Sequence, residues 1–440
     1  MTNPRPSSRK ILLVSYLFPP NGGIAVQRAL SFAKYLPPLG YEVHVLKGRN
    51  ASGPVQDPGL LRHIPAEVRI HQAFTPEIPF HFRQKIWSLL ARNRRPAAKP
   101  AATPAPAGPS RPGLPARLIR RILCPEPEIL WVPFAVRKLA KLIAREKIDT
   151  VIITVPPFSA LVVGSQIKRR FPHVRLISDF RDEWLSFYLK DFEFQNSPAT
   201  RRRAEAIERA SIEASDLVIA VTPTSLETIR SRYPEQPDAK FACLPNGYDP
   251  ASFANFHARP HAGSQVVVTH VGTLYKTASP RYYLDALDTL PEDLRSRFET
   301  RFIGRIADSE QAVLTGRKSD IRIMGFMPQS EALRQIEETD FLLLTMTNDI
   351  SLPGKLFEYL ATGKPILALA AAGSEVHQIL AETGSGWCAD PFDPAAIQFM
   401  LQKAVQYREQ AASQIHWDKV RRYERPRLTA ELAELIETRL

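Results

Sequence analysis

The chain alternates short, continuous apolar runs with longer stretches of helical spacing. Apolar runs at residues 10–15 and 41–46 flank residues 25–36, where apolar side chains recur every three or four positions. Short continuous runs are typical of strands buried on both faces, and strand, helix and strand form a βαβ unit. Further runs at residues 150–154, 175–178 and 217–221 repeat the pattern, which predicts a parallel α/β sheet in the first half of the chain.

A second series of such runs occupies the later half. It comprises residues 266–272, 300–304, 321–324, 340–344 and 365–369. We therefore predict two Rossmann-like domains, residues 1–247 and 248–416, joined near the turn at residues 245–249. Residues 417–440 have helical spacing and add no strand, so we expect this segment to pack back on the first domain. Ligands bind beyond the carboxyl ends of parallel strands, and a cleft between two facing sheets is the expected site.

Residues 79–125 interrupt this rhythm. The centre of the segment is rich in Pro and Ala, and its flanks mix apolar and basic side chains without an acid between Glu77 and Glu126. Two basic amphipathic flanks favour contact with an anionic membrane surface, and ordinary surface helices are the alternative. The residues expected to contact the membrane are Phe82, Trp87, Arg92, Arg94, Arg120 and Arg121.

Charge is distributed unevenly. Residues 1–249 contain 37 basic and 21 acidic side chains, a formal charge of +16, whereas residues 250–440 carry −3. The surplus indicates an anionic partner for the first half, although no nucleic-acid-binding motif accompanies it. Three distant cysteines, and no apolar run long enough for a signal peptide or a membrane span, predict a cytoplasmic protein at the inner membrane face.

Polar residues follow one predicted strand of the first domain. Residues 179–184 read Asp-Phe-Arg-Asp-Glu-Trp directly after the run at 175–178. Charges at a strand exit are costly unless they pair or bind a ligand. This motif predicts a functional loop, and an Arg181 salt bridge that only fixes the loop is the alternative.

Residues 353–365 are the most informative stretch of the second domain. Pro353 and Gly354 predict a turn, residues 355–361 a short helix, and Gly363 its end. Lys355 lies at the helix N-terminus, where a cation is disfavoured unless an anion binds there. Glu358 shares its face, so the two could hold a diphosphate and a ribose diol, or form an ordinary surface ion pair.

Glycine turns at two other strand ends predict weaker candidates. Gly22 and Gly23 stand between a strand and a helix start, and Gly272-Thr273 precedes Lys276. His270 falls inside a predicted strand and is expected to be a core histidine. Signatures of metal hydrolysis, serine acyl transfer and P-loop phosphoryl transfer are absent from the sequence.

Taken together, residues 16–23 with Gln27 and Arg28, the motif at 179–184, residues 246–249 and residues 355–359 resemble family 4 retaining glycosyltransferases of the GT-B fold. The chain is similar to bacterial members that build exopolysaccharide or lipid-linked glycans. The resemblance covers nearly all of it outside residues 92–112.

This resemblance implies a donor-binding set and a catalytic set. The donor-binding set comprises Gly22, Gly23, Gly272, Thr273, Lys276, Lys355, Leu356 and Glu358. The catalytic set comprises Asp179, Arg181, Asp182 and Lys355. The lysines would neutralise the donor diphosphate and Glu358 would bind its ribose, with no metal and no cofactor beyond the nucleotide-sugar co-substrate.

Three positions depart from the family pattern. Thr273 replaces an arginine, Ile350 stands where the first glutamate of a pair is usual, and the motif at 179–184 lacks a histidine common in relatives. The sequence predicts sugar transfer from a nucleotide sugar to a glycan or lipid-linked acceptor at the cytoplasmic membrane face. Alternatives are a nucleotide-sugar epimerase on the same scaffold and a catalytically weak membrane-associated scaffold.

Overall fold

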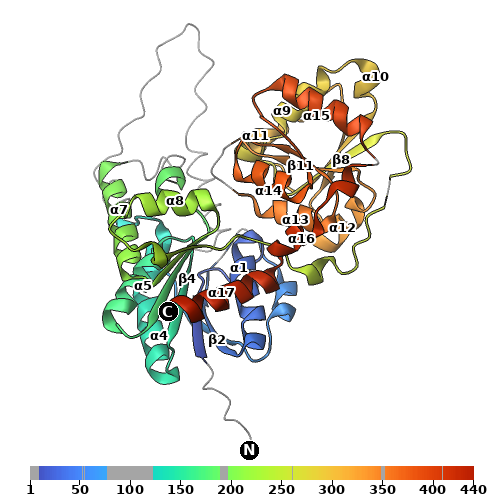
Figure 1. Cartoon of the computed structure of the whole chain (residues 1–440). Helices are drawn as coiled ribbons and strands as arrows, with labels where there is room; N and C mark the ends of the chain where they lie inside the picture. The colour runs from blue at the N-terminus through green and yellow to red at the C-terminus, as the bar shows by residue number, and fades with distance from the viewer. Residues whose placement is uncertain are drawn as a thin grey trace, which may run out of the picture. The chain divides into compact units, whose positions relative to one another are not determined.

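The chain forms two compact units (Figure 1). The computed structural model describes residues 9–51, 53, 55–76, 122–188, 197–259, 261–347, 352–408 and 410–440. Unit 1 comprises Met1–Leu244 with Thr429–Leu440, and unit 2 comprises Pro245–Leu428. Among the described residues, no helix is both long and apolar enough to cross a bilayer.

Unit 1 contains a seven-stranded parallel sheet in the order β3-β2-β1-β4-β5-β6-β7. The central strands read as continuous apolar runs because helices cover both faces. The strands are β1 (Arg9–Val14), β2 (Tyr41–Gly48), β3 (Arg69–Ala73), β4 (Thr150–Val155), β5 (Arg175–Phe180), β6 (Leu217–Ala220) and β7 (Phe241–Cys243).

Helices of unit 1 bury their apolar faces against this sheet. The main core lies beneath α4 (Val132–Glu146), α5 (Ser159–Arg170), α7 (Pro198–Ala214) and α8 (Pro223–Ser231), and α1 (Ile24–Tyr35) lies on the other face (Figure 1). Short helical turns are η1 (Pro37–Leu39), η2 (Pro58–His63), η3 (Pro127–Trp131), the π-helical η4 (Trp184–Tyr188) and η6 (Asp238–Lys240).

Unit 2 repeats the architecture with six parallel strands in the order β10-β9-β8-β11-β12-β13. The strands are β8 (Val266–Val271), β9 (Phe298–Ile303), β10 (Asp320–Gly325), β11 (Phe341–Thr345), β12 (Ile366–Leu369) and β13 (Gly386–Ala389). Alternate residues of β11 enter two separate cores, because successive side chains of a strand point to opposite faces. Both sheets confirm the predicted α/β fold.

One core of unit 2 lies beneath α9 and α15, and the other beneath α12, α13 and α14. The helices are α9 (Arg281–Asp288), α10 (Glu292–Arg295), α11 (Asp308–Gln311), α12 (Gln329–Ile336), α13 (Gly354–Thr362), α14 (Glu375–Thr383), α15 (Pro394–Gln406) and α16 (Trp417–Val420). Short turns are η7 (Pro250–Phe253), η8 (Lys276–Ala278), η9 (Ala411–Gln414) and η10 (Arg421–Tyr423).

The C-terminal segment is not one helix over residues 417–440. It breaks at η10, and α17 (Arg425–Arg439) begins in unit 2 and ends in unit 1. Leu432 and Ile436 of α17 are buried. At the end of the helix Glu437 accepts a 3.2 Å hydrogen bond from the Tyr41 hydroxyl and pairs with Arg9 at 2.8 Å.

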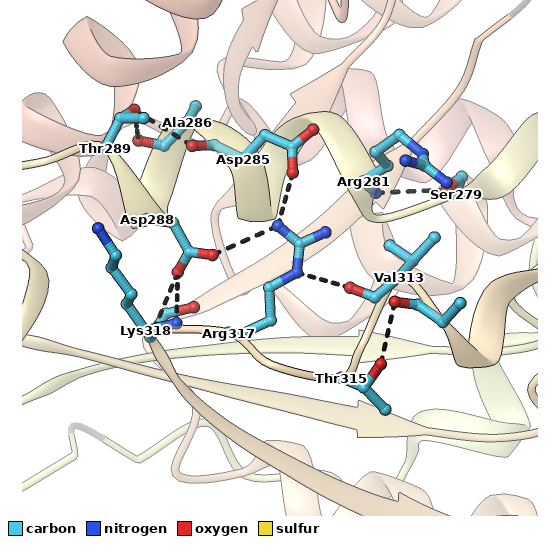
Figure 2. Close-up of polar contacts among 12 residues, drawn as sticks. Ser279, Arg281, Asp285, Ala286, Asp288, Thr289, Val313, Thr315, Arg317 and Lys318 are labelled. Carbon is cyan, nitrogen blue, oxygen red and sulfur yellow. Dashed lines mark hydrogen bonds and ion pairs between the residues drawn. The ribbon is translucent and has the colours of Figure 1, made fainter.

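A polar network holds the amino end of the edge strand β10. Figure 2 shows Arg317 between two carboxylates of α9, with Nη1 2.5 Å from Asp285 and 3.3 Å from Asp288. Asp288 also accepts bonds from the amides of Lys318 and Ser319. The network fixes the chain at the start of β10.

Candidate functional site

Three neighbouring strands of unit 2 end at glycines with positive φ. Gly272 follows β8 (φ 129°), Gly304 follows β9 (φ 135°) and Gly325 ends β10 (φ 75°). A Cβ atom on Gly304 would lie 2.2 Å from the Gly272 carbonyl oxygen, so the two loops touch through their backbones. The Gly304 amide donates a 2.8 Å hydrogen bond to the Gly325 carbonyl. Only a glycine at position 304 allows this close approach.

Gly272, Gly304 and Gly325 together form what we call the glycine edge of unit 2. Lys355, in the first turn of α13, lies over this edge. A Cβ atom on Gly272 would lie 3.1 Å from Lys355 Nζ. Burial lowers the pKa of Lys355 to about 8, and the charge of Glu358 opposes that shift. Within the described parts of the chain Lys355 makes no ion pair. A largely buried ammonium without an ion-pair partner favours an anionic ligand at this edge.

The start of α13 adds to the positive potential beside Lys355. The first amides of a helix have no intrahelical partner, and the N-terminal residue Pro353 supplies no side-chain cap. No acidic residue stands in the first turn. An oxyanion bound here would meet both the helix N-terminus and the lysine.

Glu358 does not pair with Lys355 as a surface ion pair, because no described acid lies within ion-pair distance of Lys355. Burial raises the pKa of the Glu358 carboxyl group, opposed by Arg425 and then by Lys355. Arg425 is held in place by a 3.0 Å bond to the Gly247 carbonyl. The interpretation of Lys355 and Glu358 as a surface ion pair is therefore wrong. Among the described residues, no ion pair occupies the carboxylate oxygens of Glu358, so they can accept hydrogen bonds from a ligand.

Other expected donor-binding residues of unit 2 differ in placement. Thr273 and Lys276 are exposed on the loop after Gly272. Leu356 is fully buried in a core, so its side chain anchors α13 and does not line the glycine edge, contrary to expectation. Tyr359 also anchors α13, because its hydroxyl accepts a 2.8 Å bond from the Val271 amide.

His270 was expected to be a core histidine, and its side chain is indeed fully buried. It also contacts the site, because its Nε2 lies 3.3 Å from Lys355 Nζ. Sequence reasoning missed this contact and the role of Gly304. The repeated glycine at successive strand ends was the available signal for Gly304.

In unit 1, the loop between β1 and α1 contains Gly22 and Gly23. The Gly22 amide already donates to the Val55 carbonyl at 2.9 Å, and Gly22 is buried. Gly23 is exposed, has φ 79° and precedes the first turn of α1, where no side chain caps the helix. Gly23, and not Gly22, therefore presents an open backbone.

Asp179, at the end of β5, is enclosed by an ion pair. Arg28 from α1 contacts both carboxylate oxygens, with Nη2 2.8 Å from Oδ1 and Nε 2.9 Å from Oδ2. The Asp179 side chain is fully buried and that of Arg28 is 6% exposed. Asp179 therefore joins α1 to β5 and presents no carboxylate to a substrate, contrary to the expected catalytic role.

Arg181 fixes the same loop through carbonyl groups. Its Nε donates to Val155 at 3.0 Å and its Nη2 to Pro156 at 2.5 Å, while Nη1 donates to Ala25. Because the bonds reach both β4 and α1, Arg181 positions the strand exit.

Asp182 differs from the other two acids of the motif, Asp179 and Glu183. It is exposed, whereas the neighbouring Glu183 is buried and pairs with Arg232 at 2.7 Å. No described residue forms an ion pair with Asp182. The motif therefore presents one unpaired carboxylate beyond the end of β5.

The expected membrane-contact residues Phe82, Trp87, Arg92, Arg94, Arg120 and Arg121 lie outside the described residues. Within the described ranges, no group of three or more His, Cys, Asp or Glu side chains could hold a metal ion.

Comparison with known families gives two adjoining matches. Residues 100–252 match the model described as Glycosyltransferase Family 4, and residues 265–406 match that described as Glycosyl transferases group 1. Together the matches cover more than half of the chain. A probable glycosyltransferase, WbjE of Pseudomonas aeruginosa, is 30% identical over 104 residues, which are 23% of this chain and 26% of WbjE. The chain thus spans about a quarter of that relative.

Solved structures resemble the whole chain. Sucrose-phosphate synthase from Thermosynechococcus elongatus has a TM-score of 0.64 at 13% identity, covering 98% of both chains. HepE of Anabaena in complex with UDP-glucose has a TM-score of 0.60 at 15% identity, covering 98% of this chain and 99% of HepE. With the two parallel sheets, these likenesses identify the fold as GT-B.

Proposed function

The chain belongs to the family 4 type of glycosyltransferases, and we propose that it transfers a sugar, with retention, from a nucleotide-sugar donor to a glycan or lipid-linked acceptor. The observation that carries the proposal is Lys355, a largely buried ammonium without an ion pair in the described chain, above the glycine edge of unit 2. HepE, of the same fold, binds UDP-glucose in its crystal structure. No observation favours the epimerase or the scaffold.

In the proposed reaction, the bond between sugar C1 and the phosphate oxygen breaks, and its electron pair leaves with the nucleoside diphosphate. The acceptor hydroxyl oxygen bonds to C1 on the same face, and its proton passes to the departing phosphate. Lys355 and the amides of α13 stabilise the growing negative charge, and exposed Lys276 adds a second cation. Glu358 holds the ribose diol.

Unit 1 is proposed to bind the acceptor. Asp182 is the unpaired carboxylate of the strand-exit motif. We propose that it binds the acceptor hydroxyl, in place of the histidine that is common in relatives. Arg28, Asp179 and Arg181 hold that loop in position. We expect Asp182→Asn to raise the acceptor KM while leaving nucleotide affinity unchanged.

The first test combines ligand binding with turnover. UDP, GDP or ADP should raise the thermal midpoint of the wild-type chain, because a ligand that binds only the folded state stabilises it. With the matching nucleotide sugar, Lys355→Ala should lower turnover by about 10²–10³, as for loss of one charge-stabilising donor.

The matched control is Lys364→Ala. Burial also lowers the pKa of Lys364 to about 8, but its Nζ donates to the Arg259 carbonyl at the opposite, amino edge of the sheet. Turnover of this variant should stay near wild type. An equal loss of turnover in both variants would show that removing any buried lysine impairs the protein, and would contradict a specific role of Lys355 at the site.

Action at the cytoplasmic membrane face is part of the same proposal. The outer face of α4 carries Phe134 with the exposed cations Arg137, Lys141 and Arg145. Phe74 adds a second exposed ring, 5.2 Å from that of Phe134. Exposed aromatic rings beside cations suit an anionic lipid surface.

Vesicle co-sedimentation tests this face. Arg137→Gln with Lys141→Gln should reduce sedimentation with phosphatidylglycerol vesicles, and the equal charge change Arg201→Gln with Arg202→Gln on α7 should not. Unchanged sedimentation of the α4 variant would remove α4 from the proposed membrane surface.

A further inference from the structure

His270 has one defined tautomer. Its Nδ1 lies 3.0 Å from the Leu343 carbonyl oxygen, which can only accept a hydrogen bond. Nδ1 therefore carries the proton, and the lone pair lies on Nε2. Because Nε2 is 3.3 Å from Lys355 Nζ, the lysine donates into this lone pair.

The imidazole is a neutral partner. Burial, and then the charge of Lys355, lower the pKa of His270 well below its ordinary value. A neutral acceptor orients the ammonium without cancelling its charge. An acid at this position would form a salt bridge and remove the field that an anionic ligand needs.

The other neighbours of Lys355 do not supply this orientation. Among the described residues, Glu358 is the one acid whose charge affects the pKa of Lys355. Its carboxylate nevertheless lies beyond ion-pair distance of the lysine. Gly272 contributes only backbone below Nζ. His270 reaches the lysine from β8, 85 positions away in the sequence, and is itself held by β11.

We infer that His270 is a positioning residue, which aims the Lys355 ammonium at the glycine edge and couples anion binding there to the protonation of Lys355. The inference rests on the proposed function, because the anion is the donor diphosphate. A diphosphate supplies the ion-pair partner that Lys355 lacks among the described residues, so it favours the protonated lysine. Donor binding should therefore take up a proton near and above pH 8.

The test measures nucleotide binding by calorimetry from pH 6.5 to 9.5. The probe is whichever of UDP, GDP and ADP stabilises the wild-type chain most. Wild-type affinity should fall above pH 8, and the binding enthalpy should depend on the ionisation enthalpy of the buffer. In His270→Leu the affinity should fall about tenfold, because a hydrogen bond to a charged group is lost. The midpoint of the pH dependence should move to lower pH, because the ammonium loses an acceptor.

Two further variants separate positioning from folding. His270→Gln can still present an oxygen to Lys355 and should recover part of the affinity. Phe302→Leu removes packing beside the imidazole, whose ring centroid is 6.2 Å away, without touching Lys355, and should keep the wild-type pH midpoint. If His270→Leu alone fails to fold, the comparison of His270→Gln with Phe302→Leu decides the same question.

The outcomes are distinct. If the wild-type chain binds none of the three nucleotides, the proposed function fails. If the wild type binds but the His270 variants bind equally well with the same pH midpoint, only the inference about His270 fails.

Discussion

At the scale of single residues, the site depends on pairs that are distant in sequence. His270 meets Lys355 over 85 positions, and Arg28 meets Asp179 over 151. The sequence identified Lys355, Glu358 and the motif at 179–184 as chemically unusual, but it could not say which charges pair. Ion pairing with Arg28 removed Asp179 from the candidate catalytic set and left Asp182 as the acid of that set, an outcome that depends on tertiary contacts alone.

We expect Lys355 to lower the free energy of unfolding although it supports activity. Its pKa of about 8 in the folded chain lies below the ordinary 10.5, so the charged form opposes folding below pH 8. This cost shrinks as pH rises from 8 toward 10.5. At pH 7, Lys355→Met should therefore raise the unfolding free energy by about 1–2 kcal/mol while turnover falls.

Denaturant unfolding at pH 7 and pH 10 would measure this effect, with turnover assayed in parallel. The stability gain should be smaller at pH 10. A variant that is both less stable and less active would mean that Lys355 is structural.

At the scale of elements, continuous apolar runs predicted the central strands well, as for β1, β4 and β11. The sequence did not reveal β3, β7 and β13. All three are edge strands, with a neighbouring strand on one side only, and β7 has only three residues, Phe241–Cys243. A half-covered or very short strand needs no continuous apolar run, so periodicity gives no signal there.

The glycine edge of unit 2 gives a sharp prediction for Gly304→Ala. The added Cβ would meet the Gly272 carbonyl at 2.2 Å, and φ is 135°, so the loop must move away from the strand ends. Nucleotide affinity should fall at least tenfold, and stability by about 1–3 kcal/mol.

Gly316→Ala is the matched control, because Gly316 also has positive φ (67°) but no atom within 4 Å of the added carbon. It should lose stability without losing affinity. Equal affinity in both variants, measured by calorimetry, would mean that the Gly304 loop lies outside the site.

At the scale of the whole molecule, two units with separate cores share one chain, and α17 returns to unit 1. Deletion of Thr429–Leu440 removes the buried side chains of Leu432 and Ile436 from unit 1. We expect unit 1 to lose about 4 kcal/mol or more, because each large buried aliphatic side chain contributes about 2–5 kcal/mol. Unit 2 should keep its stability.

Hydrogen exchange would measure this prediction strand by strand. Protection should fall in β1, β2 and β7 and persist in β8 and β11, and Glu434→Ala, an exposed change on the same helix, should leave both units protected. Uniform loss of protection would show that the units do not unfold separately.

The most direct test of the central claim is a crystal structure of the full chain with the donor nucleotide. The diphosphate should lie within about 3 Å of Lys355 Nζ and of the first amides of α13, above Gly272 and Gly304. A diphosphate bound elsewhere, with Lys355 still donating only to His270, would contradict the account.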